Sequence, residues 1–135
     1  MKKKVFLIGN AHLDPVWLWR KTEGYAEIKS TFRSALDRMN EFPNYVFTAS
    51  SASYYKWIEE SEPEMFEEIK RRVAEGRWVI AGGLWVQPDC NIPSGEAFAR
   101  HMLYSQRFYK AKFGQIAKFG YNVDSFGHNG MLPQL

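Results

Sequence analysis

The sequence predicts an α/β fold in which a parallel sheet or barrel is covered by helices. Short, β-rich apolar runs alternate along the chain with longer segments that carry apolar residues at helical spacing. Each short run is almost continuously hydrophobic, as in strands that are buried on both faces. A repeated strand, helix, strand, helix order implies parallel strands joined by helical crossovers. The 135 residues, 45% of them hydrophobic, are enough to build one domain with a core.

The first half of the chain contains two predicted strands and the helix between them. Residues 5–8 form the first apolar run, and residues 45–48 form the second. Between them, residues 27–40 have the pattern of an amphipathic helix, and Pro43 follows its end. Its expected buried face consists of Ile28, Phe32, Leu36 and Met39.

Two more helices and a third strand follow. The first helical stretch holds Tyr54, Tyr55, Trp57 and Ile58. In the second, Ser61 and Glu64 have the spacing of a capping box, and Gly76 supplies the left-handed residue that ends the helix. Its apolar face consists of Phe66, Ile69 and Val73. Residues 78–81 are the predicted third strand.

The last third of the chain predicts one long helix and a fourth strand. Residues 96–113 place Phe98, Met102, Tyr109 and Phe113 on one stripe, and Gly114 ends the helix. Residues 119–123 are the expected strand. Four parallel strands would leave an edge with unpaired backbone groups. We therefore expect residues 1–135 to be a single partial domain, the front part of a longer enzyme.

Charge and composition argue against several classes of protein. The net charge is +3, and its Lys and Arg residues are scattered among acidic ones, so nucleic-acid binding has little support. The apolar run at residues 5–8 is too short for a signal peptide, and no window approaches a membrane helix. The one cysteine, Cys90, excludes an intrachain disulfide framework. We expect a cytoplasmic protein without membrane or nucleic-acid partners.

Polar side chains follow three of the four predicted strands. His12 and Asp14 come after the first, a polar loop containing Asp89 comes after the third, and Asp124 and His128 come after the fourth. The carboxyl ends of parallel strands share one edge, where α/β proteins bind ligands. We expect these loops to meet there.

The residue types at this edge favour a metal site without requiring one. His12 and Asp14 are two apart, so in an extended segment both side chains point the same way, and an imidazole with carboxylates suits zinc. Such a tripeptide also occurs in ordinary loops. Asp124 has three possible roles: a third metal ligand, a nucleophile, or the N-cap of a following helix.

Three motifs, "NAHLDPVWLW", "GGLWVQPDCNIPSGEAFARH" and "GYNVDSFGHNG", occur in an order that resembles the glycoside hydrolase family 38 α-mannosidases. The resemblance covers essentially the whole chain. It implies a zinc-dependent, retaining α-mannosidase that acts on α-mannosides or mannose-containing oligosaccharides. It also implies that the chain is the N-terminal portion of a seven-stranded parallel β/α barrel, followed in the family by helical and β-sandwich domains.

The resemblance also implies roles for single residues. His12 and Asp14 match the first two zinc ligands of the family, and Trp17 matches the aromatic residue beside the sugar. Asp124 matches the residue that is both a zinc ligand and the catalytic nucleophile. Phe126 resembles a wall of the same pocket.

The family's acid/base aspartate and its remaining zinc ligand, a histidine, are expected beyond Leu135. Asp89, His101 and His128 are therefore not assigned to those roles; Asp89 either reaches substrate or builds a turn. Without these two groups the isolated chain is expected to be inactive. Three alternatives stay open: a metal-dependent deacetylase, a mannosyl-glycerate hydrolase of the same family, or a fragment that only binds. A homo-oligomeric state of the full-length form also stays open.

Overall fold

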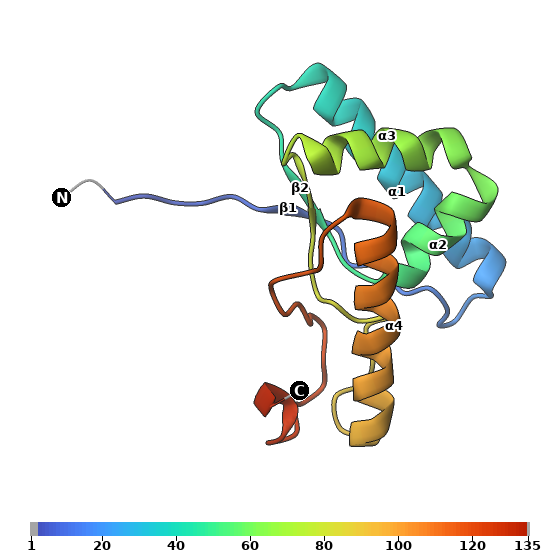
Figure 1. Ribbon diagram of the computed structural model, residues 1–135, viewed down its shortest axis with the longest axis vertical. Helices are drawn as coiled ribbons and strands as arrows, with labels where there is room; N and C mark the ends of the chain where they lie inside the picture. The colour runs from blue at the N-terminus through green and yellow to red at the C-terminus, as the bar shows by residue number, and fades with distance from the viewer. Residues whose placement is uncertain (1–2, 135) are drawn as a thin grey trace.

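Three short parallel strands form the sheet in the computed structural model, which describes residues 3–134 (Figure 1). They are β1 (Gly9–Asn10), β2 (Phe47–Ala49) and β3 (Trp78–Ile80), in the spatial order β1-β2-β3. In the register of the sheet, Phe47 lies between Gly9 and Trp78. The predicted α/β class is confirmed, and within residues 3–134 the sheet has three strands instead of four.

Four α-helices connect and cover these strands. They are α1 (Lys21–Glu41), α2 (Ala52–Ser61), α3 (Pro63–Ala74) and α4 (Gly95–Phe113), and a short 3₁₀ helix, η1 (Leu132–Gln134), follows. The helices gather on one side of the strands in Figure 1. No helix within residues 3–134 has the length and apolar character needed to cross a membrane.

Aromatic side chains make up the centre of the core between strands and helices. Trp78 of β3 packs edge-on against Phe32 of α1 and Phe47 of β2, with 5.0 Å between ring centroids in each pair. The Trp78 indole N–H donates to the Tyr55 hydroxyl at 2.9 Å, and that hydroxyl donates to the Ala49 carbonyl at 3.1 Å. Burying each of these apolar side chains contributes about 1.5–3 kcal/mol, so these contacts hold α1 and α2 against the sheet.

The first strand does not lie where the apolar run predicted it. Residues 5–8 are not in a strand, and their side chains are 75–93% exposed. A strand requires a neighbour that accepts and donates its backbone hydrogen bonds. Only Gly9 and Asn10 lie opposite β2, so the pairing begins where the apolar run ends.

The fourth predicted strand is also absent from the sheet. Residues 119–123 run past the end of β3, where the Gly82 N–H donates to the Phe119 carbonyl at 2.9 Å. The side-chain amides of two glutamines form hydrogen bonds with backbone groups that could otherwise pair with a neighbouring strand. Gln106 of α4 pairs with both the N–H and the C=O of Ala117, at 2.9 and 3.0 Å. Gln87 pairs in the same way with Val123.

Helix boundaries agree with the sequence where a glycine ends the helix and differ at other positions. Gly76 has φ +74°, its N–H donates to the Val73 carbonyl, and the Arg77 N–H donates to the Arg72 carbonyl, which is a Schellman motif. The predicted capping box is wrong, because Ser61 is the last residue of α2 and α3 begins at Pro63. Pro fits the first turn of a helix because it has no N–H to satisfy there.

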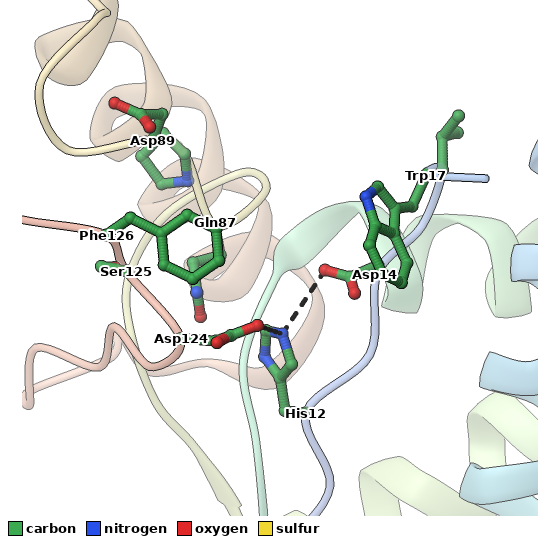
Figure 2. Close-up of a pocket in the computed structure, with 10 residues that line it drawn as sticks. His12, Asp14, Trp17, Gln87, Asp89, Asp124, Ser125 and Phe126 are labelled. Atoms are coloured by element: carbon green, nitrogen blue, oxygen red, sulfur yellow. Dashed lines mark ion pairs between the residues drawn. The ribbon is translucent and has the colours of Figure 1, made fainter.

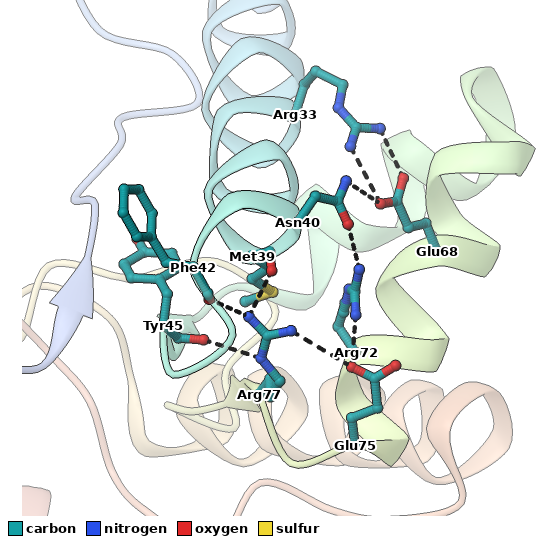
Figure 3. A network of polar contacts seen from close by, with 9 residues as sticks. All are labelled: Arg33, Met39, Asn40, Phe42, Tyr45, Glu68, Arg72, Glu75 and Arg77. Carbon is teal, nitrogen blue, oxygen red and sulfur yellow. Dashed lines mark hydrogen bonds and ion pairs between the residues drawn. The ribbon is translucent and has the colours of Figure 1, made fainter.

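Arg77 joins the end of α1 to the start of β2 (Figure 3). Its guanidinium donates to the carbonyls of Met39, Phe42 and Tyr45 at 2.8, 2.7 and 3.3 Å. The last carbonyls of a helix have no partner inside the helix, so a cation in this place satisfies them and suits the negative end of the helix dipole. The neighbouring contacts in Figure 3 involve Arg33, Asn40, Glu68, Arg72 and Glu75.

Candidate active site

Three loops meet at the carboxyl edge of the sheet and enclose one pocket (Figure 2). They follow β1, β3 and the extended segment that ends at Val123, as the sequence predicted. The lining residues are His12, Asp14, Val16, Trp17, Gln87, Pro88, Asp89, Asp124, Ser125 and Phe126. All six residues that the sequence predicts to form the site are among them.

His12 lies between two carboxylates in this pocket. Its Nε2 atom is 3.4 Å from Oδ1 of Asp14 and 3.5 Å from Oδ2 of Asp124. The three side chains are 30%, 41% and 58% exposed, so they remain accessible from the pocket. One imidazole nitrogen next to two acceptor oxygens is an arrangement that a shared cation would stabilise.

The spacing of these atoms allows a test of the predicted zinc. Tetrahedral zinc with bonds of about 2.0–2.1 Å places neighbouring donor atoms about 3.3 Å apart. The two distances from His12 Nε2 are close to this separation between donor atoms, and zinc accepts nitrogen and oxygen donors of these kinds. Within residues 3–134, however, no group of three or more His, Cys, Asp or Glu side chains converges well enough to hold a metal ion. The two pairs fit zinc, whereas a complete ligand set is not present.

Asp124 reaches the pocket through an unusual backbone conformation. Its φ is +55°, a left-handed value that Asp and Asn adopt more readily than other residues with a side chain. No helix begins at Asp124, since the next described one is η1 at Leu132. The N-cap alternative is therefore wrong, and the carboxylate is directed to His12 instead.

Tyr54 supports the loop that carries His12 and Asp14, and sequence reasoning missed this role. Its buried hydroxyl donates to the Leu13 carbonyl, between the two site residues, at 2.6 Å. Burial raises the pKa of Tyr54 to about 12, so the hydroxyl keeps the proton that it donates. Helical spacing predicted only that Tyr54 lies on a helix, and spacing contains no information about a hydroxyl 41 residues from its partner.

The same loop is held from two further directions. The Trp19 indole N–H donates to the Asp14 carbonyl at 3.1 Å. Gly24 of α1 lies against the backbone of Pro15, where a Cβ atom would come within 2.0 Å of the Pro15 carbonyl oxygen. Glycine is required at this close approach, because any side chain would push the loop away from α1.

Aromatic surface borders the two carboxylates. Trp17 is 66% exposed and packs edge-on against Trp19 with ring centroids 5.4 Å apart. Phe126 is 89% exposed and lines the same pocket (Figure 2). Exposed rings beside polar groups offer a flat apolar face to a ligand whose other side is polar, as a sugar ring is.

Asp89 lines the pocket and also builds a turn. Its Oδ1 atom accepts the backbone N–H groups of Asn91 and Ile92 at 2.7 and 2.9 Å. This is the turn role that the sequence offered as an alternative. Because the turn uses one oxygen of an exposed carboxylate, a contact with substrate through the other stays a prediction.

Other polar residues named from the sequence lie outside the pocket. His101 is on α4, where its Nδ1 atom accepts the Val86 N–H at 3.5 Å and burial lowers its pKa. His128 is exposed and does not line the pocket. Cys90 is buried beside Asn122 and Ser125. His101 and His128 are thus not among the residues that line this pocket.

Replacing Tyr54 by Phe is expected to loosen the loop of His12 and Asp14. The variant loses one buried hydrogen bond and leaves the Leu13 carbonyl with no hydroxyl donor, at a cost of about 1–3 kcal/mol. We expect Tyr54→Phe to weaken zinc binding, measured by chelator competition. Tyr55→Phe removes a buried hydroxyl from the same helix away from the pocket and is the matched control. Equal zinc affinities in the two variants would contradict this role for Tyr54.

Comparison with known proteins agrees with the resemblance seen in the motifs. The sequence matches the profile described as "Glycosyl hydrolases family 38 N-terminal domain" over residues 2–135. It is 37% identical over 132 residues to alpha-mannosidase G of Dictyostelium discoideum, covering 98% of this chain and 12% of that protein. It is 39% identical over 132 residues to an alpha-mannosidase of Saccharomyces cerevisiae, covering 97% and 12%.

Solved structures lead to the same family. An alpha-mannosidase from Enterococcus faecalis V583 has a TM-score of 0.83 and 25% identity, covering 94% of this chain and 14% of that one. The 4-alpha-glucanotransferase from Thermococcus litoralis, at 19% identity and a TM-score of 0.62, shares the fold alone. The chain spans 12% of the length of each of the two relatives above. The profile match and the two relatives, both more than 30% identical, show that this chain belongs to the N-terminal domain family of the family 38 glycosyl hydrolases.

Proposed function

We propose that the protein containing this chain is a retaining α-mannosidase that uses zinc. The observation that carries the proposal is the meeting of His12, Asp14 and Asp124 in one pocket of a family 38 domain. Relatives that cover almost the whole chain are named alpha-mannosidases, which supports a mannoside as the substrate. A neighbouring solved structure with the same name supports it further.

Asp124 is the proposed nucleophile. Its carboxylate oxygen attacks the anomeric carbon, the glycosidic C–O bond breaks, and the leaving oxygen takes a proton from a carboxylic acid. A water molecule then attacks the same carbon, gives its proton to that second carboxyl group, and releases Asp124. Asp89 is committed to its turn through Oδ1, and we assign the acid/base role to an aspartate beyond residue 135.

His12, Asp14 and Asp124 are the proposed zinc ligands in this chain, and one further ligand comes from elsewhere in the protein. When bound, zinc supplies positive charge that holds hydroxyl groups of the sugar and stabilises charge at the reaction centre. The position of Asp124 beside His12, with 58% of its side chain exposed, supports this double role with the metal and the sugar. The distances of 3.4 and 3.5 Å around His12 support its pairing with each of the two carboxylates.

Trp17 and Phe126 are the proposed contacts with the sugar. Both rings are exposed in the pocket, and the apolar face of a mannose ring can stack on an indole while its hydroxyl groups face the carboxylates. Asp89 is the proposed polar contact on the opposite loop. The seven-stranded barrel, the cytoplasmic location and a homo-oligomeric state stay predictions of the proposal.

Hydrolysis of a chromogenic α-mannoside by the intact gene product, before and after chelation, tests this function. We expect turnover that is lost on removal of the metal and returns with added zinc. A chromogenic acetamide and a mannosyl-glycerate are tested in parallel to separate the alternatives. A deacetylase would cleave only the acetamide, and a specialised glycosidase would cleave only the mannosyl-glycerate. Turnover unchanged in metal-free protein would contradict the zinc proposal.

A further inference from the structure

Gln87 contacts the backbone immediately before Asp124. Its side-chain N–H donates to the Val123 carbonyl, and its Oε1 atom accepts the Val123 N–H at 3.3 Å. One amide side chain therefore bonds both backbone groups of a single residue, as a neighbouring strand would. This pair links the loop after β3 to the residue from which Asp124 extends.

The other restraints around Asp124 come from side chains: the Ser125 hydroxyl donates to the side-chain oxygen of Asn122 at 2.7 Å, and both residues lie against the Cys90 thiol. Among residues 3–134, no backbone–backbone hydrogen bond reaches any residue from 120 to 128. Asp124 also has φ +55°, a strained conformation that persists only where the surroundings hold it. The bonds from Gln87 hold the backbone of Val123, the residue directly before Asp124, and so contribute to where the Asp124 carboxylate lies.

Gln87 also lies next to His12. It lines the pocket with His12 and Asp124 (Figure 2), and it also borders a small cavity together with His12 and Tyr54. Asp124 lies 3.5 Å from His12 Nε2, so a shift of the backbone at Val123 would change this distance. Gln87 thus bonds the residue directly before Asp124, one proposed ligand, and lines the same pocket as His12, another proposed ligand.

We propose that Gln87 is the positioning residue of the nucleophile, a role that rests on the proposed function of Asp124. Gln87 acts through Val123 and requires no contact with the substrate. Its amide replaces the missing strand neighbour at Val123 and keeps the Asp124 carboxylate at the distance from His12 that the reaction needs. A displacement of about 1 Å at a reacting group costs on the order of 10²-fold in rate.

Gln106 provides a matched control. Its amide pairs with both backbone groups of Ala117 at 2.9 and 3.0 Å, which is the same arrangement six residues before Val123 and outside the pocket. Gln87→Met and Gln106→Met each keep the length of the side chain and remove two hydrogen bonds. Because both variants lose the same number of hydrogen bonds, a difference in their activity comes from where the lost bonds lie.

The test is the rate at which a fluorinated mannosyl fluoride labels Asp124 covalently in the intact gene product. We expect Gln87→Met to slow labelling on the order of 10²-fold, to lower kcat by a similar factor with little change in KM, and to weaken zinc binding in chelator competition. Gln106→Met should change none of the three. If Gln87→Met does not fold, Gln87→Glu, which retains the acceptor for the Val123 N–H, should show a smaller effect in the same direction.

The outcomes separate the two proposals. Wild-type protein that hydrolyses an α-mannoside but is not labelled at Asp124 would overturn the assigned nucleophile, and with it the role of Gln87. Wild-type protein labelled at Asp124, with labelling rates equal in the folded Gln87 and Gln106 variants, would overturn the positioning role alone. A loss of kcat in both variants would also overturn it, since the effect would then be general.

Discussion

Replacing Asp124 by Asn is expected to lower kcat on an α-mannoside by a factor of about 10⁴–10⁶. The amide is nearly the same size as the carboxylate, but it is a poor nucleophile, and it removes one negative charge beside His12. The pocket should keep its shape, so KM should change much less than kcat. Steady-state kinetics of the intact gene product measure both constants.

Asp37→Asn is the control for Asp124→Asn. Asp37 lies on α1, where its ion pair with Arg33 is 2.9 Å long and far along the chain from the pocket loops. The control removes one carboxylate charge and should leave kcat unchanged. A Asp124→Asn variant with more than about one tenth of wild-type kcat would contradict the assignment, because loss of a nucleophile costs far more than tenfold.

Replacing His12 by Ala is expected to raise the Kd for zinc by more than 100-fold. Loss of a hydrogen-bond partner of a ligand already costs about 10–100-fold in metal affinity, and His12 is the nitrogen shared by both carboxylate pairs. Competition with a chromogenic chelator measures the Kd. Activity should fall at low zinc concentration and recover in part at high zinc concentration.

His101→Ala is the control for His12→Ala. His101 is a half-buried histidine of α4 whose contact is the Val86 N–H. Its loss should leave the Kd for zinc unchanged. A Kd that shifts equally in the two variants would show that histidine loss acts through the fold, and the ligand role of His12 would then be wrong.

The helices were predictable because their signals are local. Apolar spacing identified the buried face of α1, and Gly76 and Gly114 marked the ends of α3 and α4 through left-handed φ values of +74° and +71°. The start of α1 at Lys21 was missed because its first turn is polar and adds nothing to the apolar pattern. Local patterns cannot show whether a helix begins before its buried face does.

The strands were harder to predict because they depend on partners far along the chain. Residues 5–8 have the composition of a strand, yet only Gly9 and Asn10 have a neighbour in β2. Residues 119–123 were also apolar enough, but side chains of Gln87 and Gln106 take adjacent backbone groups. Hydrophobicity predicts that a segment can form a strand, and it contains no information on what will lie beside it.

The site was predictable to the extent that topology determines it. Parallel strands bring their carboxyl ends to one edge, and His12 and Asp124, 112 positions apart, do meet there. The supporting groups were not predictable in the same way. Tyr54 acts through one hydrogen bond and Gln87 through two, to backbone atoms 41 and 36 residues away, and no periodicity in the sequence corresponds to such contacts.

Covalent trapping tests the central claim most directly. The intact, zinc-loaded gene product is incubated with a fluorinated α-mannosyl fluoride, and the labelled peptide is identified by mass spectrometry. We expect one mannosyl adduct, attached to Asp124, in protein that hydrolyses α-mannosides. An adduct on any other residue, or turnover of an α-mannoside with inversion at the anomeric carbon and no adduct, would contradict it.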